Sequence, residues 1–196
     1  MKKTSVVALL FAGTLSAPAS AEFSDALLAG LRQGGYIIYM RHGPTNKAEQ
    51  PKEQALLKAG EFRLDDCSTQ RKLSAEGREE ARRIGEAFAS RGIPVGEVLS
   101  SQWCRCLETA RLAFGKAQPW TALNSNLNDS ARAPEEKNRE ARARLSDKPA
   151  SGNLILVTHN FNIRDLTGLT TTQGEMVIVA PEGAGRFTVV GKLKPF

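Results

Sequence analysis

Residues 36–45 read YIIYMRHGPT, a run of apolar and aromatic side chains that ends abruptly at Arg41 and His42. A short, continuous apolar run bounded by turn residues is typical of a strand buried inside a sheet. The segment NLILVTH at 153–159 repeats the pattern and ends at His159. The chain has only two histidines, and each follows such a strand closely. The sequence therefore predicts two buried strands that present imidazoles at their carboxyl ends.

Strand and helix patterns alternate along the rest of the chain. Ser74 precedes an amphipathic segment with apolar residues at Ala81, Ile84 and Phe88, which predicts a capped helix. Such alternation is typical of an α/β protein with a largely parallel sheet. Further helices are predicted around 27–31, 53–59, 102–115 and 134–149 and from 160 onward, and further strands at 97–101, 175–181 and 186–193.

The first residues have the pattern of a secretory signal peptide. Two lysines are followed by an apolar run at 6–15 and a small-residue cleavage motif at 19–21. The apolar run is well short of the ~20 residues that a membrane span needs. We therefore expect a signal peptide at 1–21, a single mature domain at 22–196 and a periplasmic or secreted location, with no membrane span.

The mature chain is mildly basic. The formal charge falls from +6 to +4 when the two lysines of the signal are removed. No Lys/Arg-rich block with interleaved aromatic residues is present, so we do not expect nucleic acid as a partner. A positive field that attracts small anions is the simpler interpretation.

The three cysteines predict a disulfide with one thiol left over. An exported protein meets an oxidising compartment, where disulfides persist. Cys104 and Cys106 lie two positions apart on a predicted helix and point to different sides, so only one of them can easily reach Cys67. The pairing stays open. A zinc site is disfavoured, because the chain has no C-x-x-C motif and both histidines follow strands.

Arginine and histidine side chains are expected to meet at one edge of the sheet. In an open parallel sheet, ligands bind at the carboxyl ends of the strands. Arg105 begins the helix after the strand at 97–101, so it should join His42 and His159 there, although taken alone it could be a surface residue paired with Glu108. Guanidinium groups bind phosphate oxygens in bidentate fashion, and imidazole is a competent nucleophile. Together these residues predict a phosphoryl site that needs no metal.

Four blocks, RHGPT, LSAEGREEAR, SSQWCRCLETA and LILVTHN, resemble the histidine phosphatase superfamily in sequence and order. The resemblance runs from about Tyr36 to about Val190. It implies the three-layer phosphoglycerate mutase-like α/β fold, with a mostly parallel central sheet flanked by helices. It also implies structural roles for Leu73 and Gly77 at a helix start, and phosphomonoester hydrolysis through a phosphohistidine, without a cofactor.

The resemblance assigns roles to individual residues. His42 would be the nucleophile that becomes phosphorylated. Arg41 and Arg105 would hold the phosphoryl oxygens, and His159 would stabilise the group in transfer. Thr45 matches a threonine of the phosphoglycerate mutase branch and is expected to contact substrate.

The family also needs an acid that protonates the leaving oxygen, and here the sequence departs from its pattern. The acid phosphatase branch has an aspartate directly after the second histidine, where this chain has Asn160, so we expect Asn160 to bind substrate instead. Asn162 does match that branch. The remaining candidates are Asp129, in the loop region used by the mutase branch, and Glu175, at the start of a strand after the His159 helix. Glu175 is the preferred acid.

The predicted function is metal-independent hydrolysis of a small phosphate ester such as a sugar phosphate. The chain looks closest to exported members of the superfamily that act on lipopolysaccharide core heptose phosphate. A mutase is disfavoured by export, because glycolytic phosphates are cytosolic. A phosphate-binding module without turnover is the other alternative, because Asn160 cannot donate the required proton. The sequence leaves the oligomeric state open.

Overall fold

The structure of the chain, a computed structural model, describes residues 24–127 and 132–194. The predicted signal peptide at 1–21 lies outside these residues. Within the described ranges, no helix combines the length and the apolar character needed to cross a membrane.

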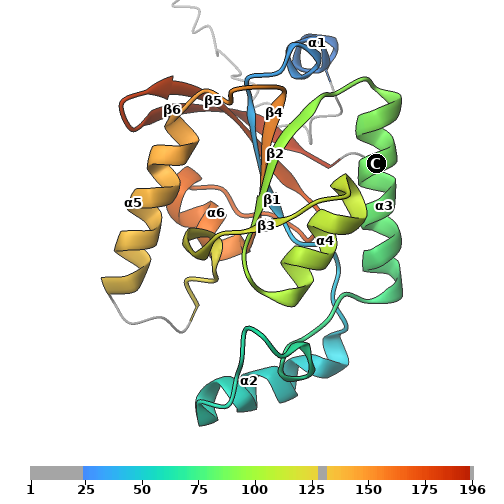
Figure 1. Cartoon of the computed structure of the whole chain (residues 1–196), viewed down its shortest axis with the longest axis vertical. Helices are drawn as coiled ribbons and strands as arrows, with labels where there is room; N and C mark the ends of the chain where they lie inside the picture. Colours follow the sequence, from blue (N-terminus) through green and yellow to red (C-terminus); the bar gives the residue numbers. More distant parts are fainter. Residues whose placement is uncertain (1–23, 128–131, 195–196) are drawn as a thin grey trace, which may run out of the picture.

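Six strands form one sheet in the order β3-β2-β4-β1-β5-β6 (Figure 1). The first four strands along the chain pair in parallel, and β5 and β6 form an antiparallel hairpin at one edge. The predicted, largely parallel α/β sheet is therefore confirmed. The strands are β1 (Ile37–Arg41), β2 (Val95–Ser100), β3 (Gln118–Pro119), β4 (Asn153–Thr158), β5 (Met176–Gly183) and β6 (Arg186–Leu193).

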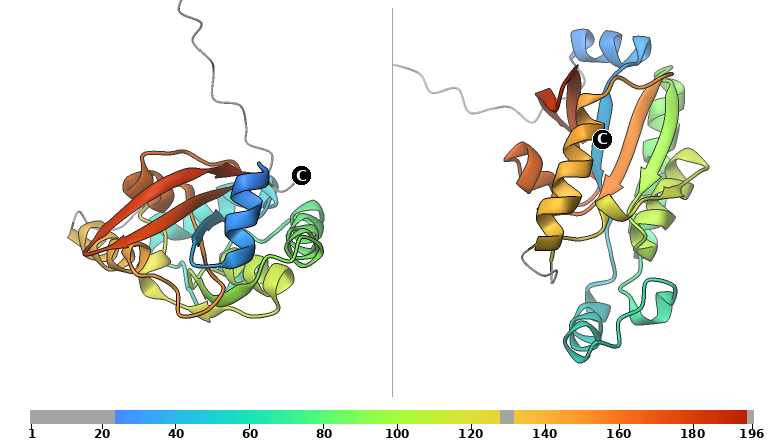
Figure 2. Two further views of the ribbon diagram at one scale, coloured as in Figure 1. Left: turned by 90° about the horizontal axis from the view of Figure 1, so that it is seen from above. Right: turned by 60° about the vertical axis from the view of Figure 1, so that its left-hand side comes forward.

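Helices cover both faces of the sheet, which gives the three layers that the resemblance implied. α3 and α4 lie on one face and α5 and α6 on the other, while α1 lies near the amino end of β1 (Figures 1 and 2). α2 lies apart, below the carboxyl ends of the central strands (Figure 1). The helices are α1 (Asp25–Gln33), α2 (Gln50–Ala59), α3 (Ala75–Ser90), α4 (Cys104–Phe114), α5 (Arg132–Ser146) and α6 (Asn160–Thr167).

The central strands are apolar throughout because both of their faces are covered. All six residues of β4 are buried. Side chains of β1 alternate between the two cores: Ile38 and Met40 pack on the α3–α4 side, and Ile37 and Tyr39 on the α5–α6 side. Burying a large apolar side chain contributes roughly 1.5–3 kcal/mol, so this pattern strongly fixes the strand register.

Gly77 allows α3 to approach the loop that follows His42. A Cβ atom on Gly77 would lie 1.9 Å from the carbonyl oxygen of Pro44, a distance that no side chain could tolerate. Ser74 caps the helix by accepting a hydrogen bond from Gly77 N (3.1 Å), and Leu73 beside it is buried. The structural roles expected for Leu73 and Gly77 are confirmed.

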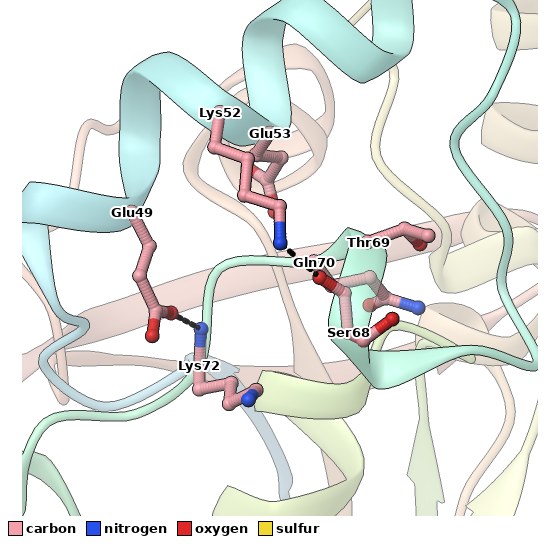
Figure 3. Close-up of a pocket in the computed structure, with 7 residues that line it drawn as sticks. All are labelled: Glu49, Lys52, Glu53, Ser68, Thr69, Gln70 and Lys72. Carbon is pink, nitrogen blue, oxygen red and sulfur yellow. Dashed lines mark hydrogen bonds between the residues drawn. The ribbon is translucent and has the colours of Figure 1, made fainter.

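Residues 46–72, which we call the α2 segment, are held mainly by polar contacts. Glu49 accepts a hydrogen bond from Lys72 N (2.8 Å), and Lys52 donates one to Ser68 O (3.1 Å), around a small cavity inside the segment (Figure 3). A disulfide between Cys67 and Cys104 ties the segment to the start of α4. This settles which cysteine pairs with Cys67.

Candidate active site

The pairing of β1 with β4 brings the two histidines together. Arg41 is in register with Thr158, and His42 N donates a hydrogen bond to Thr158 O (3.0 Å). The imidazole centroids of His42 and His159 lie 5.5 Å apart, with the rings inclined by 68°. Both side chains are buried. The predicted meeting of the histidines at the carboxyl edge is confirmed.

The surroundings of His42 select one tautomer. Nδ1 lies 2.8 Å from the carbonyl oxygen of Gly43, which can only accept, so Nδ1 carries the proton. Arg105 Nε donates a hydrogen bond to Nε2 at 3.2 Å, so Nε2 is the acceptor of this bond and carries no proton of its own. Burial, reinforced by the charge of Arg105, lowers the pKa of His42 well below its usual 6.5. At neutral pH the ring is therefore a neutral base with Nε2 as its nucleophilic atom.

His159 is held through its other ring nitrogen. Its Nε2 lies 3.0 Å from Ser101 Oγ, and Ser101 also contacts Asn124 Oδ1 (3.1 Å). Burial, followed by the charge of Arg105, lowers the pKa of His159 well below 6.5. The contact of Nε2 with Ser101 leaves Nδ1 as the ring nitrogen of His159 that could contact an anion beside His42.

Arg41 is positioned by the loop before β5. Its Nη1 donates to Thr171 O (2.5 Å), while its Nε is buried without a partner. Burial and the charges of Arg71 and Arg105 lower the pKa of Arg41. A guanidinium with an unsatisfied N–H and two cationic neighbours is a suitable donor to a phosphate oxygen.

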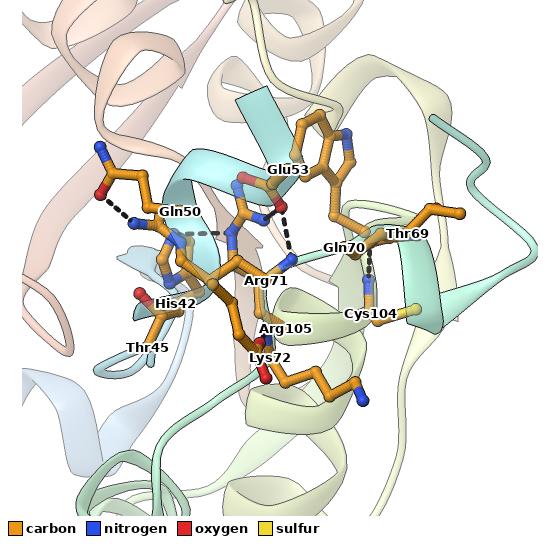
Figure 4. Close-up of polar contacts among 12 residues, drawn as sticks. His42, Thr45, Gln50, Glu53, Thr69, Gln70, Arg71, Lys72, Cys104 and Arg105 are labelled. Atoms are coloured by element: carbon orange, nitrogen blue, oxygen red, sulfur yellow. Dashed lines mark hydrogen bonds and ion pairs between the residues drawn. The ribbon is translucent and has the colours of Figure 1, made fainter. Parts of the chain in front are cut away.

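Arg105 connects the nucleophile to a buried carboxylate. Besides its contact with His42, it donates from Nη1 to Glu53 Oε2 at 2.8 Å, in an ion pair whose side chains are 5% and 7% exposed. Its guanidinium also stacks over the Trp103 ring, 4.3 Å from the centroid. The result is a rigid cation in contact with both His42 and Glu53 (Figure 4).

Glu53 and Arg71 bring the α2 segment into the site. Glu53 Oε2 also accepts from the backbone N–H of Arg71 (2.7 Å), and Arg71 Nη1 donates to Gln50 Oε1 (2.7 Å) (Figure 4). Burial, followed by the charge of Arg105, lowers the pKa of Arg71. Arg41, Arg71 and Arg105 thus form a set of mutually repelling cations, which a dianion would relieve.

A cavity of about 330 Å³ adjoins Arg105 on the side of α2. Seven of its ten lining residues are polar or charged, and three of these are cations. The lining residues are Gln50, Glu53, Gln54, Leu57, Lys58, Arg71, Trp103, Arg105, Ser125 and Leu127. The cavity has room for a polar group attached to a phosphate held by Arg105.

The family model described as Histidine phosphatase superfamily (branch 1) matches residues 37–129, which contain Arg41, His42 and Arg105. The structure supplies the second histidine at the expected strand end. The chain belongs to the histidine phosphatase superfamily.

Solved structures of histidine phosphatases share the fold. A putative α-ribazole-5′-P phosphatase from Escherichia coli is 18% identical with a TM-score of 0.60, and the protein histidine phosphatase SixA, complexed with tungstate, is 14% identical with a TM-score of 0.58. A phosphoserine phosphatase from Entamoeba histolytica, in complex with phosphoserine, is 13% identical with a TM-score of 0.56. Each alignment covers 82% of this chain and 97% of the other. No curated protein sequence matches the chain.

Two residues expected to bind substrate in this histidine phosphatase have structural contacts instead. Asn160 Oδ1 accepts from Thr171 N (2.7 Å), and thereby supports the carbonyl that holds Arg41. Thr45 is buried and accepts from Gln173 Nε2 (3.0 Å). Both residues therefore brace the loops around the histidine phosphatase site, and a direct contact with substrate stays a prediction.

Glu175, the predicted acid, lies beside Arg41 but is engaged elsewhere. Its Oε1 pairs with Lys192 (2.8 Å), and its Oε2 accepts from Thr172 N (2.7 Å). Burial opposes ionisation, but the hydrogen bonds from Lys192 and Thr172 outweigh it and lower the pKa of Glu175. An ionised carboxylate is a poor proton donor at neutral pH. Asp129, the other predicted acid, lies outside the described residues.

Sequence reasoning about this histidine phosphatase missed Glu53 and Arg71. Glu53 lies 52 positions before its partner Arg105, in a polar stretch without a motif. The available signal was the predicted disulfide, because a bridge from Cys67 to the Arg105 helix would bring this stretch to the site. Among the described residues, no cluster of His, Cys, Asp and Glu side chains has the arrangement of a metal site.

Proposed function

We propose that the protein is a phosphomonoester hydrolase that works through a phosphohistidine on His42, without a metal. His42 Nε2 attacks phosphorus, the bond from phosphorus to the leaving oxygen breaks, and water then hydrolyses the N–P bond. Guanidinium groups of Arg41 and Arg105 stabilise the transferring phosphoryl group, and His159 adds a ring nitrogen. Fixed charges of this kind commonly supply the largest share of a rate enhancement.

One observation carries the proposal: Arg105 donates to Nε2 of an imidazole whose Nδ1 is already committed to a carbonyl. That arrangement keeps the nucleophilic lone pair free of a proton and places a phosphate-binding cation directly beside it. A histidine with only a structural role would not need a guanidinium on its free nitrogen, at the cost of burying a charge.

The neighbours support the same chemistry. SixA is a phosphatase crystallised with tungstate, an oxyanion, and the Entamoeba protein was crystallised with a phosphorylated amino acid. At identities below 25%, these similarities extend to the fold and not to the substrate.

The cavity beside Arg105 offers several polar side chains to a hydroxyl-rich leaving group, so we extend the proposal to a sugar phosphate. Amide and cationic side chains in its wall, such as Gln50, Gln54 and Arg71, are suitable donors to hydroxyl oxygens or to a second anionic group. The N-terminal pattern leads us to propose that the enzyme works after export, in the periplasm or outside the cell.

The test is hydrolysis of p-nitrophenyl phosphate in the presence of EDTA. We expect wild-type protein to release p-nitrophenol under these conditions, and His42→Ala to lose essentially all turnover. Rapid quench in alkaline detergent with radiolabelled phosphate ester should trap a phosphoenzyme in the wild type alone, and the label should be released on later exposure to acid, as expected for a phosphohistidine. Undiminished activity in His42→Ala would overturn the mechanism, and tight phosphate binding without turnover in the wild type would identify a binding module.

A further inference from the structure

We propose that Glu53, from the α2 segment, protonates the leaving oxygen and later deprotonates the attacking water. This inference rests on the proposed function, and it answers the question that the sequence left open. An alkoxide is a poor leaving group, so cleavage of an alkyl phosphate needs a proton donor within reach of the ester oxygen.

The position of Glu53 meets that requirement. Its carboxylate shares the Arg105 guanidinium with His42, since Nε of Arg105 donates to His42 and Nη1 to Glu53. It also lines the cavity that would receive the leaving group. A phosphoryl group held by Arg105 would therefore have both the nucleophile and a carboxyl group beside it, the two groups that in-line transfer with a protonated leaving group uses.

Other carboxylates among the described residues are less well placed. Glu175 is paired with Lys192. Glu80 has a buried oxygen without a partner, but this oxygen faces the backbone of Gly174, and Glu80 is absent from the wall of the cavity. Glu53 is the carboxylate that contacts both Arg105 and the cavity.

Substrate binding would itself prepare Glu53 to donate. In the free protein, Glu53 Oε2 and Arg105 Nη1 are paired at 2.8 Å. A phosphate oxygen that binds Arg105 competes for the same N–H groups and brings negative charge next to Glu53. Loss of a cationic partner and gain of an anionic neighbour both favour the protonated carboxyl group. Glu53 would thus take up a proton, from solvent or from the monoanion of the phosphate ester, when the substrate is in place.

The two steps balance with Glu53 as acid and then as base. In the first, the His42 Nε2 lone pair forms the N–P bond, the P–O bond breaks, and the Glu53 proton goes to the leaving oxygen. In the second, the Glu53 carboxylate takes a proton from water as the water oxygen bonds to phosphorus and the N–P bond breaks. Inorganic phosphate leaves, and both residues return to their starting states.

Dependence on the leaving group tests this role. p-Nitrophenolate leaves without a proton, whereas an alkoxide does not, so we compare p-nitrophenyl phosphate with glycerol 2-phosphate in single-turnover experiments with excess enzyme. Glu53→Gln should slow phosphoryl transfer from glycerol 2-phosphate by about 10²- to 10⁴-fold and from p-nitrophenyl phosphate by less than about tenfold. Under multiple turnover, the variant should accumulate phosphohistidine, because the second step lacks its base.

Glu49→Gln is the matched control. Glu49 accepts a backbone hydrogen bond from Lys72, as Glu53 does from Arg71, but among the described residues it has no hydrogen bond or ion pair with Arg105. It should leave both rates unchanged. Equal losses on both esters in Glu53→Gln would mean that Glu53 only positions Arg105 and would overturn the inference, as would no loss on either. A wild type that cleaves neither ester would overturn the proposed function itself.

Discussion

The sheet edge and the α2 segment contribute to the same site by different physical means. At the sheet edge, Arg41 is the last residue of β1, and His42 and His159 follow β1 and β4. Both strands are buried on both faces, so register and core packing fix these positions. In the α2 segment, Leu57 and Phe62 are the partly buried side chains that reach the main core. The segment depends instead on hydrogen bonds, the ion pair between Glu53 and Arg105, and a disulfide.

The sheet edge and the α2 segment therefore serve different tasks in the site. Holding the phosphoryl group and its nucleophile requires a geometry that does not change, and a close-packed core provides it. The part of the substrate beyond the phosphoryl group differs from one phosphatase to another. A segment attached by polar contacts can change in sequence with little loss of stability in the rest of the fold. Gln70 illustrates the attachment: it accepts a hydrogen bond from Cys104 N (2.9 Å) and so caps the helix that carries Arg105.

Removal of Arg105 should have the largest effect, because this residue joins the two regions. We expect Arg105→Ala to lower kcat/KM for p-nitrophenyl phosphate on the order of 10³-fold, from loss of a fixed positive charge at the phosphoryl group. Arg63→Ala is the matched control, since Arg63 pairs with Asp65 at the surface of the α2 segment. It should retain full activity. Comparable losses in the two variants would indicate that net charge, rather than the site, governs the rate.

Removal of the disulfide should destabilise the α2 segment more than the sheet. The bridge between Cys67 and Cys104 closes a loop of 37 residues, so Cys67→Ser/Cys104→Ser should lower the free energy of unfolding by about 3 kcal/mol. Amide hydrogen exchange should accelerate in residues 46–72 while β1 and β4 stay protected. Reduced wild type serves as the control and should match the double variant in urea unfolding. Unchanged exchange in the segment would show that its polar contacts suffice.

Acidification should destabilise the sheet edge. Both histidines have folded-state pKa values well below 6.5, chiefly through burial, so below pH 6.5 the unfolded chain binds protons that the folded chain does not. Stability is therefore lost as pH falls through 6.5, by about 1 kcal/mol per histidine between pH 7 and 5.5. Urea unfolding at the two pH values measures the change. His159→Gln should halve the loss of stability that the two histidines cause between these pH values. An unchanged pH dependence in that variant would contradict the attribution of this loss to the buried histidines.

The same division explains what could be predicted from the sequence. The strands that end in His42 and His159 were predictable because a continuous apolar run requires a buried strand, and parallel strands end at one edge. Arg105 was predictable from its place at a helix start. Ser74 caps α3 as expected.

Positions in the α2 segment could not be read in this way. The role of Glu53 depends on a hydrogen bond to Arg71 N and an ion pair to Arg105, and neither contact has a periodicity in the sequence. Glu175 was chosen as the acid because its strand leads to the right edge. Its partner Lys192 belongs to the adjacent strand β6, and that pairing is visible only once the β5–β6 register is known.

Glu175→Gln should have the smallest effect, and it tests the contribution of the sheet edge alone. The carboxylate is already ionised and paired with Lys192, so its removal takes away a stabilising charge near Arg41 and no proton donor. We expect kcat/KM to fall by less than about fivefold, equally for glycerol 2-phosphate and p-nitrophenyl phosphate, since a partly exposed ion pair contributes about 1 kcal/mol or less. Lys192→Met removes the partner of the same pair and should behave similarly. If kcat/KM of Glu175→Gln instead fell by about 10²-fold or more for the alkyl ester alone, Glu175 at the sheet edge would be the proton donor. The α2 segment would then contribute only to substrate binding.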